Sequence, residues 1–336
     1  MNFDPNVPFV IAISMSLLAA FLWGSWFISL KHLAVYPLEA FYLTLFTFSF
    51  FFVWIIGIFF DGGQLVYNIV SVWKLDPSRV FVTFLCGILY VIGMLLSLYV
   101  IKMIGLAISQ PIYASVNVIG GTILSAFIGG IPEGLTIFRI ILVLVLLTSA
   151  VFFSMAAGNV RNKAQIKDRI TTGLETDQKA MIKGMILLVI GSLILPAYTV
   201  GLSYGLRSIT QPEGLAPLPF MAVLSTGAFA GASLICGAKL TIKNQWKLIW
   251  STRFQTHLLG ILSGLAHYGG NIIHTFATRN LSSVVSWPLG FTAGLWTQMW
   301  GLVYGEFKGS PARGYWLLGI GVGCYILGAM IISNFI

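Results

Sequence analysis

One stretch of the sequence places polar side chains at helical spacing inside an otherwise apolar run. These four residues, spaced four, three and four apart, are His267, Asn271, His274 and Thr278. Such spacing puts all four on one face of a helix. Imidazole, amide and hydroxyl groups can exchange hydrogen bonds with an uncharged polar molecule, and an imidazole titrates near pH 6.5. The stripe predicts a binding surface. The alternative for each histidine is a hydrogen bond that holds neighbouring helices together.

The apolar run that follows, 282–305, adds aromatic rings beside helix-breaking residues. Pro288 and Gly290 predict a broken or thinned helix, where Trp287 and Trp296 can line a cavity and Gln298 can donate a hydrogen bond. A polar-striped helix beside a broken one is what a polar path through a bilayer requires.

A second group of candidates lies in the first half of the chain. Trp23 and Trp26 flank Gly24, so their rings can also face a cavity. Flat apolar rings beside hydrogen-bonding groups suit a sugar or a planar heterocycle. Three further polar residues repeat at helical spacing and are candidates to face the same cavity: Gln110, Tyr113 and Asn117. Two weaker candidates are Tyr90 and Tyr198.

Composition restricts the class of protein. Of 336 residues, 57% are hydrophobic and 9% are charged, whereas about a quarter of a soluble domain is charged. The net charge of +9 does not indicate nucleic-acid binding, because the basic residues gather in short segments between apolar runs. The chain is therefore predicted to be an all-α, multi-pass membrane protein in contact with the lipid bilayer. Its three cysteines lie singly in apolar runs and are expected to be packing residues.

Ten apolar runs are each long enough to cross about 30 Å of hydrocarbon as a helix. The predicted spans are 7–30, 38–60, 80–101, 106–129, 136–157, 183–206, 215–238, 254–278, 282–305 and 313–334. The very short connections at 102–105 and 279–281 predict two tight helical hairpins. We place the end of the eighth span at Arg279 and Asn280.

A polar segment, 158–182, divides the predicted spans into two sets of five, 1–157 and 183–336. A shift of 173 residues aligns Leu85–Leu89 with Leu258–Leu262, Gly121 with Gly294 and Glu133 with Glu306. An odd number of spans per repeat gives the two halves opposite orientations. We therefore expect two inverted five-helix repeats with a binding site at their interface, and a linker between them.

Lysine and arginine define the expected orientation. Five of the 19 fall on the side of the two termini and 14 on the opposite side, which by the positive-inside rule is cytoplasmic. Both termini then face outward from a plasma membrane or bacterial inner membrane.

The ten carboxylates all fall in predicted loops or at helix ends, so no carboxylate is expected at mid-membrane. Among them, Glu39 is expected to lie nearest to mid-membrane. It is either a proton-coupling residue or an interfacial residue paired with Lys31 or His32. His267 is the other candidate for proton coupling. No metal-binding, phosphate-binding or nucleophile motif is present, so neither an enzyme nor a cofactor is expected. Uphill transport would then use an ion gradient.

Three short motifs resemble those of the drug/metabolite transporter superfamily, in its branch of glucose/ribose uptake proteins, rhamnose-proton symporters and ureide permeases. They are Trp23-Gly24-Ser25-Trp26 followed by Lys31, Leu38–Tyr42 and Gly305–Gly309. The resemblance covers nearly the whole chain in layout. It implies two inverted five-helix repeats around a central cavity, with uptake of a small polar metabolite, often together with protons.

One position departs from this pattern. Ureide-permease-like proteins tend to carry an Asp where this chain has Thr44, so any proton coupling here would involve Glu39 or a histidine. We expect a secondary transporter that imports a small neutral polar molecule, above all a monosaccharide, by alternating access. The alternatives are a ureide or nucleobase permease, a drug or metabolite exporter, a membrane scaffold or sensor, and, last, an intramembrane enzyme. Oligomeric state is not encoded in any of these patterns.

Overall fold

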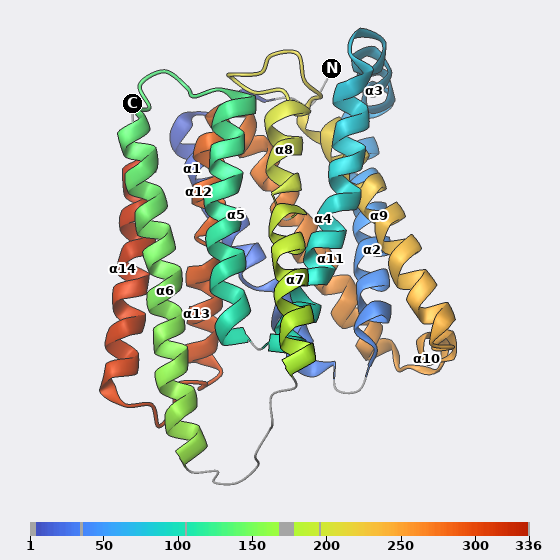
Figure 1. Cartoon of the computed structure of the whole chain (residues 1–336). Helices are drawn as coiled ribbons and strands as arrows, with labels where there is room; N and C mark the ends of the chain where they lie inside the picture. The colour runs from blue at the N-terminus through green and yellow to red at the C-terminus, as the bar shows by residue number, and fades with distance from the viewer. Residues whose placement is uncertain (1–4, 34–35, 105, 168–177, 195, 335–336) are drawn as a thin grey trace.

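The chain folds as a bundle of long helices standing side by side (Figure 1). The computed structural model describes residues 5–33, 36–104, 106–167, 178–194 and 196–334. Within these residues all regular elements are helices, and β-type pairing is limited to two isolated backbone bridges. This confirms the predicted all-α class.

The first half of the chain contains α1 (Phe9–Trp23), the 3₁₀ helix η1 (Trp26–His32), α2 (Leu38–Asp61), α3 (Gly63–Leu75), α4 (Pro77–Ile104), α5 (Leu106–Gly129) and α6 (Ile137–Lys167). The second half contains α7 (Gln178–Ile194), α8 (Ala197–Tyr204), α9 (Pro217–Ile242), α10 (Trp246–Ser251), α11 (Phe254–Leu281), α12 (Ser283–Phe291), α13 (Ala293–Val303) and α14 (Ala312–Ser333). The predicted linker boundaries, 158 and 182, therefore fall inside α6 and α7, and residues 168–177 lie outside the described part.

The two ends of the bundle differ in which parts of the chain they carry. Helix α1 begins and α14 ends at the upper end in Figure 1, which we call the terminal end. Helix α6 ends and α7 begins at the lower end, which we call the linker end.

In the described part of the chain, eight helical segments are long and apolar enough to cross a membrane, so the chain is a polytopic membrane protein. They are Phe9–Leu30, Leu38–Asp61, Pro77–Ser97, Ile112–Gly129, Ile137–Arg161, Ile182–Tyr204, Pro217–Ile242 and Ala312–Ser333. The predicted spans 254–278 and 282–305 are not among them. Their exclusion has a physical reason: α11 carries the polar stripe, and 282–305 is divided into helices of 9 and 11 residues.

Three of the predicted continuous spans are interrupted. In 7–30, α1 ends before Gly24 and the chain continues as η1. In 183–206, α7 ends at Ile194 and α8 begins after Pro196, whose ring cannot donate the hydrogen bond that a continuous helix needs. In 282–305 the interruption is at Thr292, and Pro288 lies inside α12 rather than at the break. Interruptions at membrane depth leave backbone groups available for other partners.

The predicted tight hairpin near 279–281 is present, since α11 and α12 are separated by Ser282 alone. Helix α4 ends at Ile104 and α5 begins at Leu106, so the other predicted connection, 102–105, is helical up to 104, and residue 105 lies outside the described part. Ser282 has a φ of 64°, in the left-handed region that reverses the chain. The end of α11 was predicted too early, because the helix continues through Arg279 and Asn280 to Leu281.

Between the second and third long spans the chain forms α3, which no apolar run predicted. Its buried residues, Leu65, Asn68 and Val72, lie three and four apart, as an amphipathic helix requires. Asn68 Oδ1 accepts a hydrogen bond of 3.1 Å from the Ala216 backbone N–H, which ties α3 to the start of α9.

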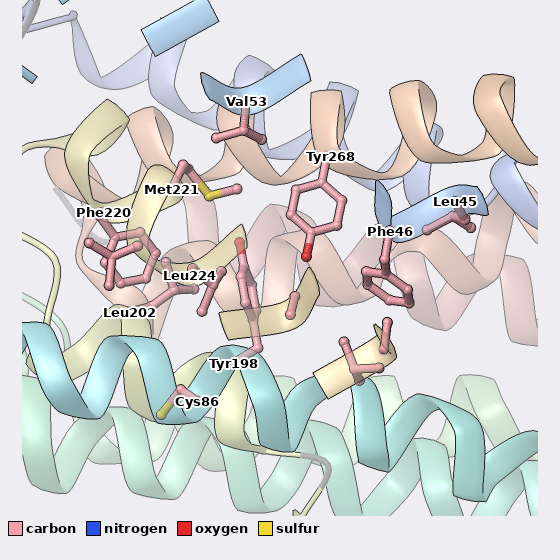
Figure 2. Close-up of a cluster of buried hydrophobic side chains, with 14 of the residues drawn as sticks. Leu45, Phe46, Val53, Cys86, Tyr198, Leu202, Phe220, Met221, Leu224 and Tyr268 are labelled. Carbon is pink, nitrogen blue, oxygen red and sulfur yellow. The ribbon is translucent and has the colours of Figure 1, made fainter. Parts of the chain in front are cut away.

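The largest apolar cluster lies where α2, α4, α8, α9 and α11 meet, and Figure 2 shows part of it. Tyr198 of α8 and Tyr268 of α11 both reach into it. Helices α6 and α14 pack together on the opposite flank. Helix α11 packs against α1 and α2, so its stripe faces the interior.

Candidate functional site

The polar stripe of α11 is buried in the bundle. His267 is 4% exposed, and Asn271, His274 and Thr278 are fully buried. Helix α1 packs along α11, while the residues that face the stripe come from α1, η1, α4, α8 and α12. A neutral polar face enclosed by other helices is either a packing device or a binding site, and the partners of each group distinguish the two.

His267 lies between aromatic rings of two elements. Its Nε2 is 2.5 Å from the Tyr90 hydroxyl of α4, and the two rings are nearly parallel, with an interplanar angle of 8° and centroids 5.9 Å apart. The Trp26 ring approaches edge-on, with centroids 5.3 Å apart. His267 Nδ1 is buried and has no hydrogen-bond partner among the described residues. Of the two ring nitrogens of this imidazole, Nε2 therefore has a hydrogen bond and Nδ1 has none.

Asn271 is held by Trp23 of α1. The Trp23 Nε1–H donates a 2.8 Å hydrogen bond to Asn271 Oδ1. Two glycines make room for the indole: a Cβ at Gly270 would lie 2.8 Å from Trp23 Nε1, and one at Gly290 would lie 2.6 Å from its Cζ3. Asn271 Nδ2 meets no acceptor in hydrogen-bonding geometry, although the Tyr90 hydroxyl interacts with this amide.

His274 has a defined hydrogen-bond pattern. Its Nε2 lies 3.0 Å from the Ser286 carbonyl oxygen, and a carbonyl can only accept, so Nε2 carries the proton. In the neutral ring Nδ1 is then an acceptor, with the Tyr198 hydroxyl at 3.4 Å and the Thr278 hydroxyl at 3.5 Å. The Trp23 ring lies beside His274, with centroids 4.7 Å apart.

Trp287 connects α12 to α5. Its Nε1–H donates a 3.3 Å hydrogen bond to the Asn117 carbonyl oxygen, and its ring lies 6.0 Å from Tyr198 and 6.2 Å from Trp23. The Asn117 side-chain oxygen is buried without a partner among the described residues. We call the following residues the central cluster: Trp23, Trp26, Tyr90, Asn117, Tyr198, His267, Asn271, His274 and Trp287.

Four of the buried side-chain polar atoms that lack a hydrogen bond in the described part of the chain lie in or beside this cluster. They are His267 Nδ1, Asn271 Nδ2, Asn117 Oδ1 and the Tyr268 hydroxyl. A buried polar group without a hydrogen bond costs about 1–3 kcal/mol, so proteins seldom retain several together without a use for them. Donors and acceptors held open among flat rings fit a polar ligand with apolar faces.

Three other predicted residues contact neighbours outside the central cluster, and a fourth is not described. Tyr113 packs against Val100 and Leu188, and its hydroxyl donates to the Leu187 carbonyl at 3.4 Å. Trp296 packs against Phe21, with ring centroids 4.9 Å apart. Gln298 Nε2 donates to the Ser154 hydroxyl of α6. The Gln110 side chain lies outside the described part of the chain. The structure thus directs Tyr113, Trp296 and Gln298 to other neighbours.

Glu39 is buried at the linker end, and its partner differs from the predicted ones. Its Oε1 accepts hydrogen bonds of 2.8 Å from both the Tyr99 hydroxyl and Lys243 Nζ, so it pairs across the bundle with α9. His32, predicted as a partner, is exposed, and the Lys31 side chain lies outside the described part. Glu39 is therefore an ion-pair partner in this conformation.

Tyr90 and Tyr198 were ranked as weaker candidates, yet each lies against a histidine of the stripe. Their sequence neighbourhoods are apolar, and only the packing of α4 and α8 on α11 identifies them. Tyr268 was not predicted; in Figure 2 its ring points from α11 toward the same interior as Tyr198. The described residues contain no group of three His, Cys, Asp or Glu side chains that could hold a metal ion.

The comparisons with known proteins provide no match: no protein-family model fits the chain, and no curated protein is significantly similar to it.

Proposed function

We propose that this protein is a secondary transporter that imports a small neutral polar molecule, a monosaccharide above all, and binds it at the central cluster. The observation that carries the proposal is the buried set of unpaired hydrogen-bonding atoms, led by His267 Nδ1 and Asn271 Nδ2, among the rings of Trp23, Trp26 and Trp287. A pyranose has hydroxyls around its rim and C–H groups on its faces, and this set matches both.

The charge distribution supports a neutral substrate. The buried carboxylate Glu39 and the ion pair of Arg161 with Glu306 lie at the linker end, and Arg79 with Asp76 lies at the terminal end. The central cluster itself contains no Asp, Glu, Lys or Arg side chain. A charged substrate would lack a counter-ion there.

The packing of the helices supports ten crossings in two inverted repeats. If α1, α2, α4, α5 and α6 correspond to α7–α8, α9, α11, α12–α13 and α14, contacts occur in matched pairs. Helix α1 packs on α11 as α4 packs on α7; α4 packs on α9 as α11 packs on α2. In this arrangement α11 and α12–α13 are the eighth and ninth spans, and the site lies between the repeats.

The helix breaks support alternating access. The breaks after α1 and between α7 and α8 fall in corresponding spans of the two proposed repeats, and α12–α13 is also interrupted. Broken helices let one half of a span move relative to the other. With the positive-inside orientation, the terminal end faces outward and transport is directed inward. We propose His267, rather than Glu39, for any proton coupling, because Glu39 is already engaged by Lys243.

Uptake of labelled monosaccharides into cells or proteoliposomes tests the proposal. Uptake by His267→Ala and by Asn271→Ala should fall at least about tenfold, the loss expected when one or two buried hydrogen bonds to a ligand are removed. His257→Ala is the matched control: His257 lies on the same helix, outside the cluster, and bonds the Ile249 carbonyl oxygen. Wild-type uptake by both cluster variants at normal protein levels would contradict the site.

The near-parallel rings of Tyr90 and His267 also suit a planar heterocycle, so a ureide or nucleobase is the second candidate substrate. Competition distinguishes the two: inhibition of uptake by uracil or allantoin, with none by sugars, would favour this candidate. Export instead of import would indicate the drug or metabolite exporter.

A further inference from the structure

Beyond the stripe, toward the terminal end, serine hydroxyls from three helices meet. Ser203 of α8 lies with its Oγ 2.8 Å from Ser283 Oγ of α12 and 3.1 Å from Ser125 Oγ of α5. All three are at most 2% exposed. The backbones approach closely here, since a Cβ at Gly129 would lie 3.1 Å from Ser283 Oγ. We call Ser125, Ser203 and Ser283 the hydroxyl cluster.

Two buried hydroxyls next to this cluster have no partner among the described residues. Ser282 adjoins Ser283, and Thr122 precedes Ser125 by three residues on the same face of α5. Both are fully buried, and neither Ser282 Oγ nor Thr122 Oγ1 has a hydrogen bond. The cluster therefore keeps hydrogen-bonding capacity that packing alone does not use.

A cavity of about 370 Å³ lies directly outside the hydroxyl cluster, at the terminal end. It is lined by Phe9, Ile131, Pro132, Glu133, Ile209, Thr210 and Asn280. Two of its lining residues are close in sequence to the cluster: Ile131 follows Gly129 by two residues, and Asn280 precedes Ser282 and Ser283. The exposed Glu133 and Ile209 mark its opening to the outside.

On its inner side the hydroxyl cluster continues into the central cluster. Ser286, one helical turn after Ser283, lies with its Oγ 2.7 Å from Thr278 Oγ1. Thr278 is the last residue of the stripe, four residues after His274. Ser286 and Thr278 thus place two bonded hydroxyls between the hydroxyl cluster and His274, whose Nδ1 lies 3.5 Å from the Thr278 hydroxyl.

We propose that this cavity is the outer vestibule of the substrate path and that the hydroxyl cluster is the gate between it and the central cluster. This inference rests on the proposed transport function. Small hydroxyl side chains suit a gate because they bond one another when the helices meet and bond water or a sugar hydroxyl when they part. An apolar contact would expose apolar surface to water each time it opened, and an ion pair would resist opening.

The Arg79 network fastens the helices on either side of this gate. Arg79 Nη1 donates a 2.9 Å hydrogen bond to the carbonyl oxygen of Tyr204, the neighbour of Ser203. It also lies 3.3 Å from Gln211 Oε1, and Gln211 Nε2 donates to the Ile128 carbonyl oxygen at 3.0 Å. The ends of α5 and α8 are therefore joined through α4 in the closed state.

A disulfide across the gate provides the test. In a background with Cys86, Cys236 and Cys324 replaced by alanine, Ser203→Cys and Ser283→Cys are combined and oxidised with copper phenanthroline. The 2.8 Å oxygen separation is compatible with the Cβ spacing of a disulfide. We expect oxidation to lower sugar uptake at least about tenfold and dithiothreitol to restore it. A complete cross-link that leaves uptake unchanged, or no cross-link at all, would overturn the gate.

Labelling with a membrane-impermeant methanethiosulfonate tests the gate independently of any substrate. Ser283→Cys alone should react from the terminal end and not from the linker end. Ser225→Cys is the matched control: Ser225 is a buried serine of α9 whose hydroxyl bonds only its own helix, and it should not react. Equal reactivity of both variants, or reaction of Ser283→Cys from the linker end alone, would contradict the gate. Absence of uptake in the unmodified parent would instead contradict the proposed function.

Discussion

Two buried polar regions of this molecule differ in how completely their groups are paired. At the terminal end, Arg79 is engaged on every side: Asp76 Oδ2 lies 3.2 Å from its Nε, the Tyr204 carbonyl accepts from Nη1, and the Tyr204 ring lies 5.2 Å from the guanidinium carbon. A hydrogen bond from Ser78 and the charge of Arg79 lower the pKa of Asp76. The central cluster instead leaves His267 Nδ1 without a hydrogen-bond partner and Asn271 Nδ2 without an acceptor in hydrogen-bonding geometry.

Under the proposed function, this difference separates groups that hold the fold from groups that are kept for a ligand. A saturated charge network gains its stability from bonds already formed. An unsaturated neutral cluster costs stability in the free protein and recovers it on binding. Substitutions in the two regions should therefore affect different measurements.

Arg79→Ala should have the largest effect on stability. It removes a nearly buried charge with hydrogen bonds to Tyr204 and Gln211, and we expect a loss of about 2–4 kcal/mol in the free energy of unfolding. Equilibrium unfolding of the purified protein in detergent measures this loss of stability. Arg139→Ala is the control, since the Arg139 side chain is only partly buried and donates a single hydrogen bond, to the Asn334 carbonyl oxygen; its cost should be below about 0.5 kcal/mol. Equal effects would mean that the Arg79 network is not structural.

A matched pair of tyrosines sharpens the comparison within the cluster. Tyr90→Phe leaves His267 Nε2 unpaired, so we expect a cost of about 1–2 kcal/mol and a roughly tenfold fall in uptake. Tyr268→Phe removes a hydroxyl without a partner and should leave stability unchanged or raise it by about 1 kcal/mol. A larger loss of stability in Tyr268→Phe than in Tyr90→Phe would contradict the assignment of their hydroxyls.

Glu39→Gln should have a smaller effect than Arg79→Ala or Tyr90→Phe. Its partner Lys243 is half exposed, so losing the ion pair should cost about 0.5–1 kcal/mol, and Gln keeps an oxygen for the Tyr99 hydroxyl. The pH dependence of uptake should remain that of the wild type. If the substitution abolished that dependence, Glu39 and not His267 would be the coupling group.

Much of the fold followed from patterns that a single segment contains. Apolar length predicted the long helices, and spacing placed the four polar residues of α11 on one buried face. Apolar length and residue spacing did not predict the helix break at Pro196 or the short helix α3. Pro196 interrupts a run that is apolar throughout, and α3 forms from an amphipathic segment too short and too mixed to stand out.

The composition of the central cluster was less predictable, because it depends on contacts between distant segments. Tyr90 and Tyr198 lie in apolar surroundings, and only their packing against α11 distinguishes them from other interior tyrosines. Gln298 follows the break at Thr292, and α13 turns it toward Ser154 of α6. The pairing of Glu39 with Lys243 spans 204 residues, which local sequence does not reveal.

The most direct test of the central claim, that the α11 stripe binds a neutral solute, is ligand-induced stabilisation of the purified protein. Melting temperatures are measured with monosaccharides, uracil, allantoin and a cationic dye, for wild type, Asn271→Ala and His257→Ala. A ligand that binds only the folded state must raise the melting temperature. We predict that a monosaccharide stabilises wild type and His257→Ala but not Asn271→Ala. Stabilisation of all three proteins alike, or of wild type by the cationic dye alone, would contradict the account.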